Sequence, residues 1–167
     1  MTLPDQARTL SIGLKIITLV LLTGLLREKA LAITEALPPM NWVGLQSALF
    51  LAMALPPFWI SLIAPILYLT ALWSASEVLM RISRGEAFQD AVQTGLRDVG
   101  SNLVWGAAAA LILQPTLMHW SEMDFRGFYG ILFKITVADL TIGLIGATLF
   151  VLARLGKTLQ SELDSFV

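Results

Sequence analysis

The sequence predicts an all-α integral membrane protein, a bundle of four transmembrane helices with a short cytoplasmic amphipathic helix between the second and third. Two observations carry this prediction. Of the 167 residues, 56% are hydrophobic and only 14% are charged, whereas soluble domains average about 25% charged residues. The charges are also unevenly placed, because none lies between Glu35 and Glu77 or between Asp98 and Glu122. Uncharged stretches of this length are typical of chains that cross a bilayer.

Charge and cysteine content exclude several other classes. The formal net charge is -1, so the chain lacks the basic surface of a nucleic-acid-binding protein, and we expect no direct nucleic-acid partner. The absence of cysteine excludes disulfides, thiolate zinc sites and a cysteine nucleophile. The sequence also has no Gly-x-Ser-x-Gly elbow, no phosphate-binding glycine-rich loop and no His-Glu-x-x-His pair. We therefore expect no enzymatic activity, no catalytic residues and no cofactor.

Four segments are apolar enough to cross the membrane, and they form a single domain over residues 1–167. A spanning helix needs about 20 mostly apolar residues. The expected crossings are, in chain order, about 10–27, 57–80, 99–118 and 131–153.

The first crossing also has an alternative interpretation as a secretory signal. Arg8 precedes its apolar stretch, which ends near a candidate cleavage pattern at Ala30-Leu31-Ala32. Arg27 and Lys29 lie directly before that pattern, where charge is unusual. We therefore expect the segment to be retained as a transmembrane helix.

Prolines are expected to shape the second crossing. Pro56-Pro57 should begin or bend it, because proline lacks a backbone N–H and fits best in a first helical turn. The apolar stretch ahead of them, 45–55, is expected to form a separate short helix at the interface. Pro65 lies inside the crossing and predicts a kink.

The connection between the second and third crossings contains the amphipathic helix. Gly85 supplies a break, and Phe88, Val92, Leu96 and Val99 then recur at helical spacing, so that this stripe can rest on the bilayer or on the bundle. The opposite face is polar, either simply solvated or a docking face for a cytoplasmic protein. The candidate residues for such a contact are Arg81, Arg84, Gly85, Glu86, Phe88 and Arg97.

Charged residues also mark the cytoplasmic end of the second crossing. Glu77 and Arg81 are four residues apart, a spacing that predicts an ion pair on one helix face. Binding of anionic lipid headgroups by Arg81 and Arg84 is the alternative.

Small residues recur along the last two crossings. Such stripes allow close approach of helix backbones, so we expect the two faces to meet. The residues are Asn102, Gly106 and Ala110 in the third crossing and Asp139, Gly143, Gly146 and Ala147 in the fourth.

Asp139 is the one charged residue expected deep in the membrane. Counting back from Arg154 along a helix places it about 22 Å from that charge, whereas Lys134 reaches the far interface. A carboxylate at this depth costs about 2.5 to 3.5 kcal/mol and is a candidate functional group for protons or cations. The alternative is a structural carboxylate that is hydrogen-bonded to Asn102, Gln114 or a serine. Asp139 and Asn102 are the candidate intramembrane residues.

A cluster of metal-capable side chains, His119, Glu122 and Asp124, lies in the loop after the third crossing. One histidine and two carboxylates could hold only a weakly bound divalent ion, and no second His or Cys completes a zinc site. We therefore expect no metal centre.

The distribution of Lys and Arg predicts the orientation. With four crossings, both termini and the middle loop share one side, and that side holds most of the 11 basic residues, which favours the cytoplasm. Trp42 and Trp120 then lie at the outer interface, where aromatic residues gather. The basic residues of the cytoplasmic side are Arg8, Lys15, Arg81, Arg84, Arg97, Arg154 and Lys157.

Two segments carry a family resemblance. The first is the run Arg-Ile-Ser-Arg-Gly-Glu-Ala-Phe over 81–88, followed by Val92, Leu96 and Gly100. The second is the closing pattern of Gly156, Leu159, Glu162, Leu163 and Val167. With the four-pass layout, they resemble the bacterial membrane family catalogued as domain of unknown function 2975. The chain departs from that family at Ala87, where members tend to have Pro, and at Phe166-Val167, where they tend to end in Thr-Val.

The resemblance implies a location in the bacterial cytoplasmic (inner) membrane but no activity. Some members lie beside small helix-turn-helix regulators, which implies a cytoplasmic partner of that kind. We expect a non-enzymatic regulatory or sensory protein that is embedded in the lipid bilayer and acts through cytoplasmic contacts. The alternative is a small transporter or channel subunit that uses Asp139. That role requires a homo-oligomer, because four short helices rarely enclose a pathway.

Overall fold

The computed structural model describes residues 3–36, 45–122 and 130–164. These residues form helices and an extended segment at 130–136, without any strand. The elements are α1 (Leu3–Ala36), α2 (Leu45–Ser83), α3 (Phe88–Ala108), a π-helical turn η1 (Ala109–Leu113), α4 (Gln114–Glu122) and α5 (Val137–Asp164).

Four stretches of the described helices are long and apolar enough to span a membrane: Asp5–Ala32, Leu55–Ser83, Phe88–Ser121 and Val137–Gly156. The predicted all-α membrane protein with four transmembrane helices is therefore confirmed. The third stretch contains 34 residues, about 51 Å at 1.5 Å per residue. Since the hydrocarbon core is about 30 Å thick, α3, η1 and α4 together form a rod longer than the core.

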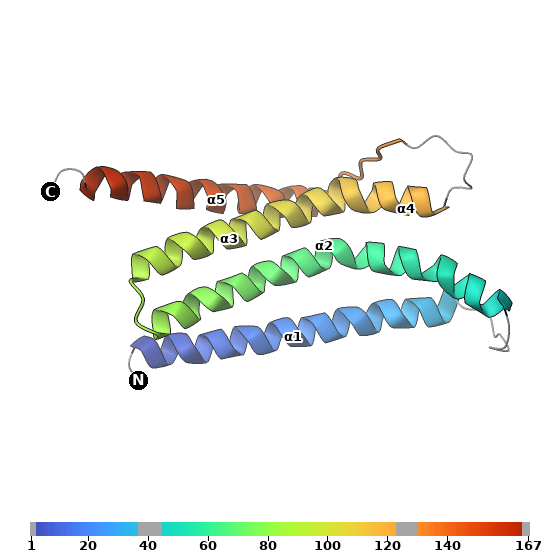
Figure 1. The fold of residues 1–167 in the computed structure, drawn as a ribbon, viewed down its shortest axis with the longest axis horizontal. Helices are drawn as coiled ribbons and strands as arrows, with labels where there is room; N and C mark the ends of the chain where they lie inside the picture. Colours follow the sequence, from blue (N-terminus) through green and yellow to red (C-terminus); the bar gives the residue numbers. More distant parts are fainter. Residues whose placement is uncertain (1–2, 37–44, 123–129, 165–167) are drawn as a thin grey trace.

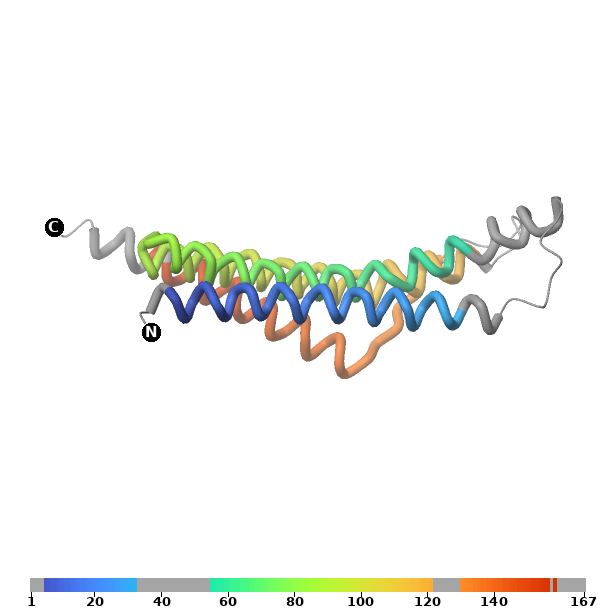
Figure 2. The backbone as a smooth tube through the Cα atoms, turned by 90° about the horizontal axis from the view of Figure 1, so that it is seen from below, coloured from blue at the N-terminus to red at the C-terminus, as the bar shows by residue number. Residues whose placement is uncertain are grey.

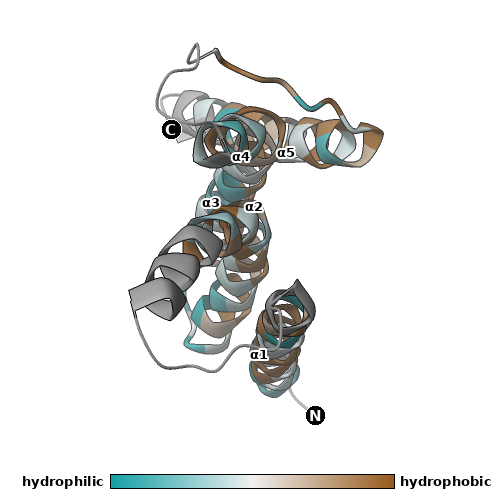
Figure 3. Cartoon of the chain, turned by 90° about the vertical axis from the view of Figure 1, so that its right-hand side faces the viewer, coloured by the Kyte–Doolittle hydropathy of each residue, from teal (hydrophilic) through white to brown (hydrophobic). Residues whose placement is uncertain are grey.

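The helices are arranged in chain order. Helix α1 packs on α2, α2 packs on α3, and α3 packs on α5 (Figure 1). Viewed from the end, the four helices form an arc with α1 and α5 at its two limbs (Figure 3), and the described parts of these limbs do not pack extensively on each other. Figure 2 shows the beginning of α5 displaced to the same side as α1. The inner side of the arc is therefore open.

Both chain termini and the α2–α3 turn lie at one end of the molecule, here named the terminal end (Figure 1). The opposite end is named the distal end. The turn follows from Gly85, whose φ of +84° suits only glycine without strain. The Gly85 N–H donates to Ile82 O at 3.1 Å, and the Glu86 N–H donates to Arg81 O at 3.3 Å. This is the Schellman pattern that closes a helix C-terminus, and it confirms the predicted break.

The expected amphipathic helix forms the first turns of α3 and continues into the third crossing without interruption, because no proline separates them. Its buried face consists of small residues, Ala91 and Gly95. A Cβ atom on Gly95 would lie 1.9 Å from Val78 Cγ2 of α2, so this face packs directly on that helix. The large residue Phe88 is 68% exposed instead.

The starts of α2 and α5 also differ from the predicted ones. The stretch 45–55 is not a separate interfacial helix, because α2 runs through it and contains Pro56, Pro57 and Pro65 in its interior. Figure 1 shows α2 bending along this length, as expected where prolines interrupt the hydrogen-bond ladder. The fourth crossing, expected over 131–153, becomes helical only at Val137.

The late start of α5 has a local cause. Thr136 Oγ1 accepts a hydrogen bond from the Asp139 N–H at 3.2 Å and also donates to the Asp139 carboxylate. Thr136 therefore acts as the N-cap of α5, and its hydroxyl also bonds the acidic side chain three positions later. The cap fixes the helix start one residue after Thr136.

Close approach of α3 and α5 depends on glycine. A Cβ atom on Gly100 would lie 2.6 Å from Gly146 O, and one on Gly143 would lie 2.8 Å from Ala107 Cβ. The small-residue stripe of the fourth crossing thus faces α3, as predicted. The expected face of α3 is wrong, however, because Gly106 lies against Tyr68 of α2 and Asn102 bonds Ser74 of α2. The two stripes do not meet each other.

Candidate functional site

A cavity of about 400 Å³ lies in the distal half of the molecule, and we name it the distal cavity. Residues from α1, α2, η1, α4, the 130–136 segment and α5 contribute to it, so it lies on the inner side of the arc (Figure 3). Its polar lining includes Lys29, Tyr68, Gln114, Lys134, Thr136 and Asp139.

Asp139 lies in the first turn of α5 at the wall of the distal cavity and is partly buried. Its Oδ1 accepts a hydrogen bond from Tyr68 OH at 2.9 Å, and its Oδ2 accepts one from Thr136 Oγ1. The positive end of the helix dipole also favours a carboxylate in the first turn of a helix. The side chain is therefore held as a hydrogen-bond acceptor between α2 and the start of α5.

The sequence interpretation named other partners for Asp139, and they are wrong. Asn102 Nδ2 donates to Ser74 Oγ at 3.1 Å, and Gln114 Nε2 donates to Ser61 O at 3.3 Å. The missed residue is Tyr68. A hydroxyl within an apolar crossing requires a hydrogen-bond partner, and this requirement could have pointed to Tyr68.

The depth of Asp139 follows from the α3–α5 contact. Gly143 lies against Ala107, and the two helices are antiparallel, so Asp139, one turn before Gly143, is level with about Leu111. Leu111 is near the middle of the uncharged stretch 99–121. Asn102 lies more than two turns away toward the terminal end. The two intramembrane candidates, Asp139 and Asn102, therefore lie at different levels along the helices, and of the two only Asp139 lines the distal cavity.

Non-helical backbone lies beside the cavity, and its polar groups have partners. In an α-helix, Leu111 O would accept from residue 115, but Pro115 has no N–H. The Lys134 N–H donates to Leu111 O at 2.9 Å instead. Thr116 Oγ1 accepts from the Leu132 N–H and donates to Leu132 O, both at 3.1 Å. Extended backbone at membrane depth is tolerated where the protein satisfies it in this way.

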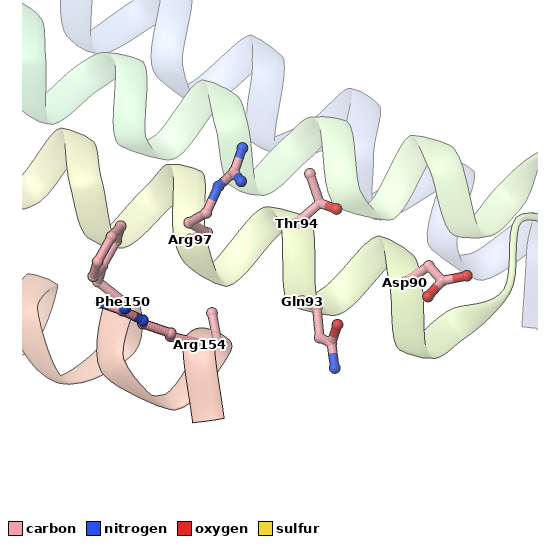
Figure 4. A pocket seen from close by; sticks show the side chains of 7 residues that line it. Asp90, Gln93, Thr94, Arg97, Phe150 and Arg154 are labelled. Carbon is pink, nitrogen blue, oxygen red and sulfur yellow. The ribbon is translucent and has the colours of Figure 1, made fainter. Parts of the chain in front are cut away.

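A second hollow lies at the terminal end between α3 and α5, with a volume of about 470 Å³. We name it the terminal hollow. Figure 4 shows Arg154 beside Phe150 on α5, whereas Arg97 extends from α3 away from α5. Arg97 also lies 3.6 Å from Asp98, between Nε and Oδ1. The other lining residues are Asp90, Gln93, Thr94 and Ala153.

The remaining candidate contact residues gather at the α2–α3 turn. Arg84, Gly85, Glu86 and Phe88 are exposed there, and Arg81 is partly buried. Arg97 lies more than two turns along α3 from Phe88. The structure therefore divides the candidate contact residues between the turn and the terminal hollow.

The predicted ion pair between Glu77 and Arg81 is wrong. Glu77 Oε1 instead accepts from Lys15 Nζ of α1 at 2.8 Å. Lys15 also lies 5.1 Å from the ring centre of Trp73. Lys15 thus joins α1 to α2.

The described residues contain no group of three or more side chains that could hold a metal ion. Of the cluster noted in the sequence, Asp124 lies outside the described residues.

Of three comparisons with known proteins, one identifies a family. No curated protein and no solved structure matches the chain. Residues 45–167 match the family model described as "Protein of unknown function (DUF2975)". Since this match covers more than half of the chain, the protein belongs to the DUF2975 family of membrane proteins.

Proposed function

We propose that this protein is a non-enzymatic sensory or regulatory protein of the bacterial inner membrane. It binds a ligand in the distal cavity and reports the occupancy of that cavity to a cytoplasmic protein at the terminal end. The single observation that carries this proposal is the continuous rod of α3, η1 and α4, which reaches from the α2–α3 turn to the distal cavity.

Contacts at both ends of the rod support such coupling. In the distal half, Gln114 of α4 bonds Ser61 of α2, and Leu111 of η1 bonds the segment that leads into α5. Toward the terminal end, Gly95 packs on α2 and Gly100 packs on α5. A ligand that competes for the Tyr68–Asp139 hydrogen bond would change how α2 and α5 hold the rod. Closely packed helices transmit such changes as small rigid-body shifts.

The terminal end has the features of a partner surface. It presents exposed charges and Phe88 at the turn, and the terminal hollow lies beside them. The excess of Lys and Arg on this side favours a cytoplasmic location. The resemblance discussed above suggests a helix-turn-helix regulator as the partner.

Photo-crosslinking in cells tests this proposal. A crosslinking amino acid at position 84 is expected to capture a helix-turn-helix regulator, identified by mass spectrometry. The same amino acid at position 27, an exposed arginine at the distal end of α1, serves as the matched control and should not capture it. Asp139→Asn should change the yield at position 84 by about fivefold or more, the lower end of typical allosteric coupling. Equal capture from both positions, or a crosslinking yield at position 84 that does not change in Asp139→Asn, would refute the proposal.

A transporter or channel subunit is the second candidate. One observation favours it, namely a carboxylate beside non-helical backbone that lines a cavity, since transporters build substrate sites in this way. The described helices of one chain form an open arc, so a pathway would require further copies. Proton flux into proteoliposomes should then disappear in Asp139→Asn, and an unchanged flux would remove this candidate.

A further inference from the structure

The charged side chains that line the distal cavity do not form ion pairs with one another. The Asp139 carboxylate accepts hydrogen bonds from the hydroxyl groups of Tyr68 and Thr136 and lies at a helix N-terminus. Neither Lys29 nor Lys134 forms an ion pair with it. The carboxylate is therefore stabilised by hydrogen bonds rather than by the two lysines that line the same cavity.

Lys29 and Lys134 approach the cavity from opposite limbs of the arc. Lys29 belongs to α1, and Lys134 belongs to the extended segment before α5. Within the part of the chain that the structure describes, neither ammonium group has an ion-pair partner. The Lys134 backbone is fixed by its bond to Leu111 O, so its side chain starts from a defined point on the cavity wall.

Two ammonium groups that line one cavity favour an anionic partner. Charged side chains at membrane depth are costly, and they pair with opposite charges or line water-filled cavities. Coulomb attraction to an anion is stronger there than in bulk water, because the local dielectric constant is lower. Charge complementarity therefore points to an oxyanion that lies between the two lysines.

The rest of the cavity is suited to an apolar chain. Its walls include Ala64, Pro65, Ala110, Pro115 and Met118. The arc is open between α1 and α5 on this side (Figure 3), so a chain attached to the anion can continue into the bilayer. A volume of about 400 Å³ suits a headgroup and its first carbons rather than a whole lipid.

We propose that the distal cavity binds the phosphate of an anionic phospholipid, held between Lys29 and Lys134, with the acyl chains leaving through the open side of the arc. This inference rests on the proposed function, because it identifies the ligand to which the protein responds as a component of its own membrane. The shared chemistry is a phosphate oxyanion, and its two sources are a lipid headgroup and free phosphate.

Native mass spectrometry of the full chain in detergent, titrated with phosphatidylglycerol, tests the proposal. Lys29→Gln and Lys134→Gln are each expected to weaken phosphatidylglycerol binding about fivefold, which corresponds to about 1 kcal/mol for each basic residue near an anionic lipid. Arg27→Gln is the matched control, because Arg27 has the same charge on the same helix end but does not line the cavity. Phosphatidylglycerol binding by Arg27→Gln should change by less than about twofold. Lys134→Arg should retain binding, since it keeps the charge.

Two further titrations separate the sources of the phosphate. Phosphatidylcholine, which carries no net charge, should bind equally weakly to the wild type and to both lysine variants. Inorganic phosphate at millimolar concentration should not displace phosphatidylglycerol, whereas displacement would assign the site to free phosphate and overturn the lipid proposal. Equal losses in Arg27→Gln and Lys29→Gln would overturn the site itself, since they would indicate general surface attraction.

Failure of this proposal is distinguishable from failure of the proposed function. If phosphatidylglycerol binding does not depend on the two lysines but position 84 still captures a regulator in an Asp139-dependent way, the sensory role stands with another ligand. If lipid binding depends on the lysines but no regulator is captured, the lipid site stands without that role.

Discussion

The terminal and distal halves of the molecule are built in different ways. In the terminal half, continuous helices pack through small residues, as at Gly95 against Val78 and Gly100 against Gly146. In the distal half, Pro115, the π-helical turn and the extended segment 130–136 interrupt regular structure. There the Lys134 backbone N–H and the Thr116 side chain complete the hydrogen bonding. Tight packing of helices thus depends on continuous helical backbone with small residues at the contacts. The polar cavity depends instead on interrupted backbone whose polar groups are bonded by other segments. Four substitutions test this contrast, in order of decreasing expected effect.

Gly146→Leu should have the largest effect. A Cβ atom at this position would lie 2.6 Å from Leu103 Cβ and 2.8 Å from Gly100 O, so α3 and α5 must separate. Overpacking of this kind costs about 1 to 3 kcal/mol, and backbone contact favours the upper end. Thermal unfolding in detergent measures the loss. Gly13→Leu is the control, because no atom lies within 4 Å of a Cβ there, and an equal loss in both variants would contradict the α3–α5 contact.

Tyr68→Phe tests the polar half. The change removes the hydroxyl donor to Asp139 Oδ1 while the ring remains. A hydrogen bond to a charged group contributes about 1.5 to 3 kcal/mol, and we expect a loss of about 2 kcal/mol in detergent unfolding. Thr148→Val, which removes an exposed hydroxyl that bonds only its own helix, should be nearly neutral. A neutral Tyr68→Phe would show that Asp139 does not depend on α2.

Gly85→Ala tests the turn at the terminal end. The left-handed conformation costs a residue with a side chain about 1 to 2 kcal/mol. We expect a loss of about 1 kcal/mol and faster amide hydrogen exchange at Glu86, whose N–H closes the helix end. Gly24→Ala, in a helix with open space around it, should stabilise slightly instead. Unchanged exchange at Glu86 would argue against the Schellman closure.

Lys15→Met should have the smallest effect. The Lys15–Glu77 pair is partly exposed, with side-chain exposures of 24% and 41%, and exposed ion pairs contribute about 0 to 1 kcal/mol. We expect a loss below about 1 kcal/mol that shrinks further as salt is added. A larger loss, or one that is independent of salt, would mean that this pair is a principal link between α1 and α2.

The sequence predicted the terminal half better than the distal half, for a physical reason. The turn could be predicted from Gly85 alone, and the crossings from uncharged stretches of sequence, because both signals lie in single residues or short segments of the chain. The start of α5 depends on Thr136 and on a partner for Leu111 O, which Lys134 supplies from outside the helix. The Asp139–Tyr68 bond likewise joins α2 to α5. Such pairings between distant segments leave no periodic pattern in the chain.

The chain-order arrangement also bears on assembly of the protein in the membrane. Since α1 packs on α2, α2 on α3 and α3 on α5, each helix that emerges during synthesis meets its main partner already in place. After α2, each helix can pack on the helix synthesised before it, and no packed pair has to separate for a later helix to insert between its members. Contacts between neighbouring segments also form quickly, because closing short loops costs little entropy. A chain that ends after α4 should therefore still insert its first three crossings correctly.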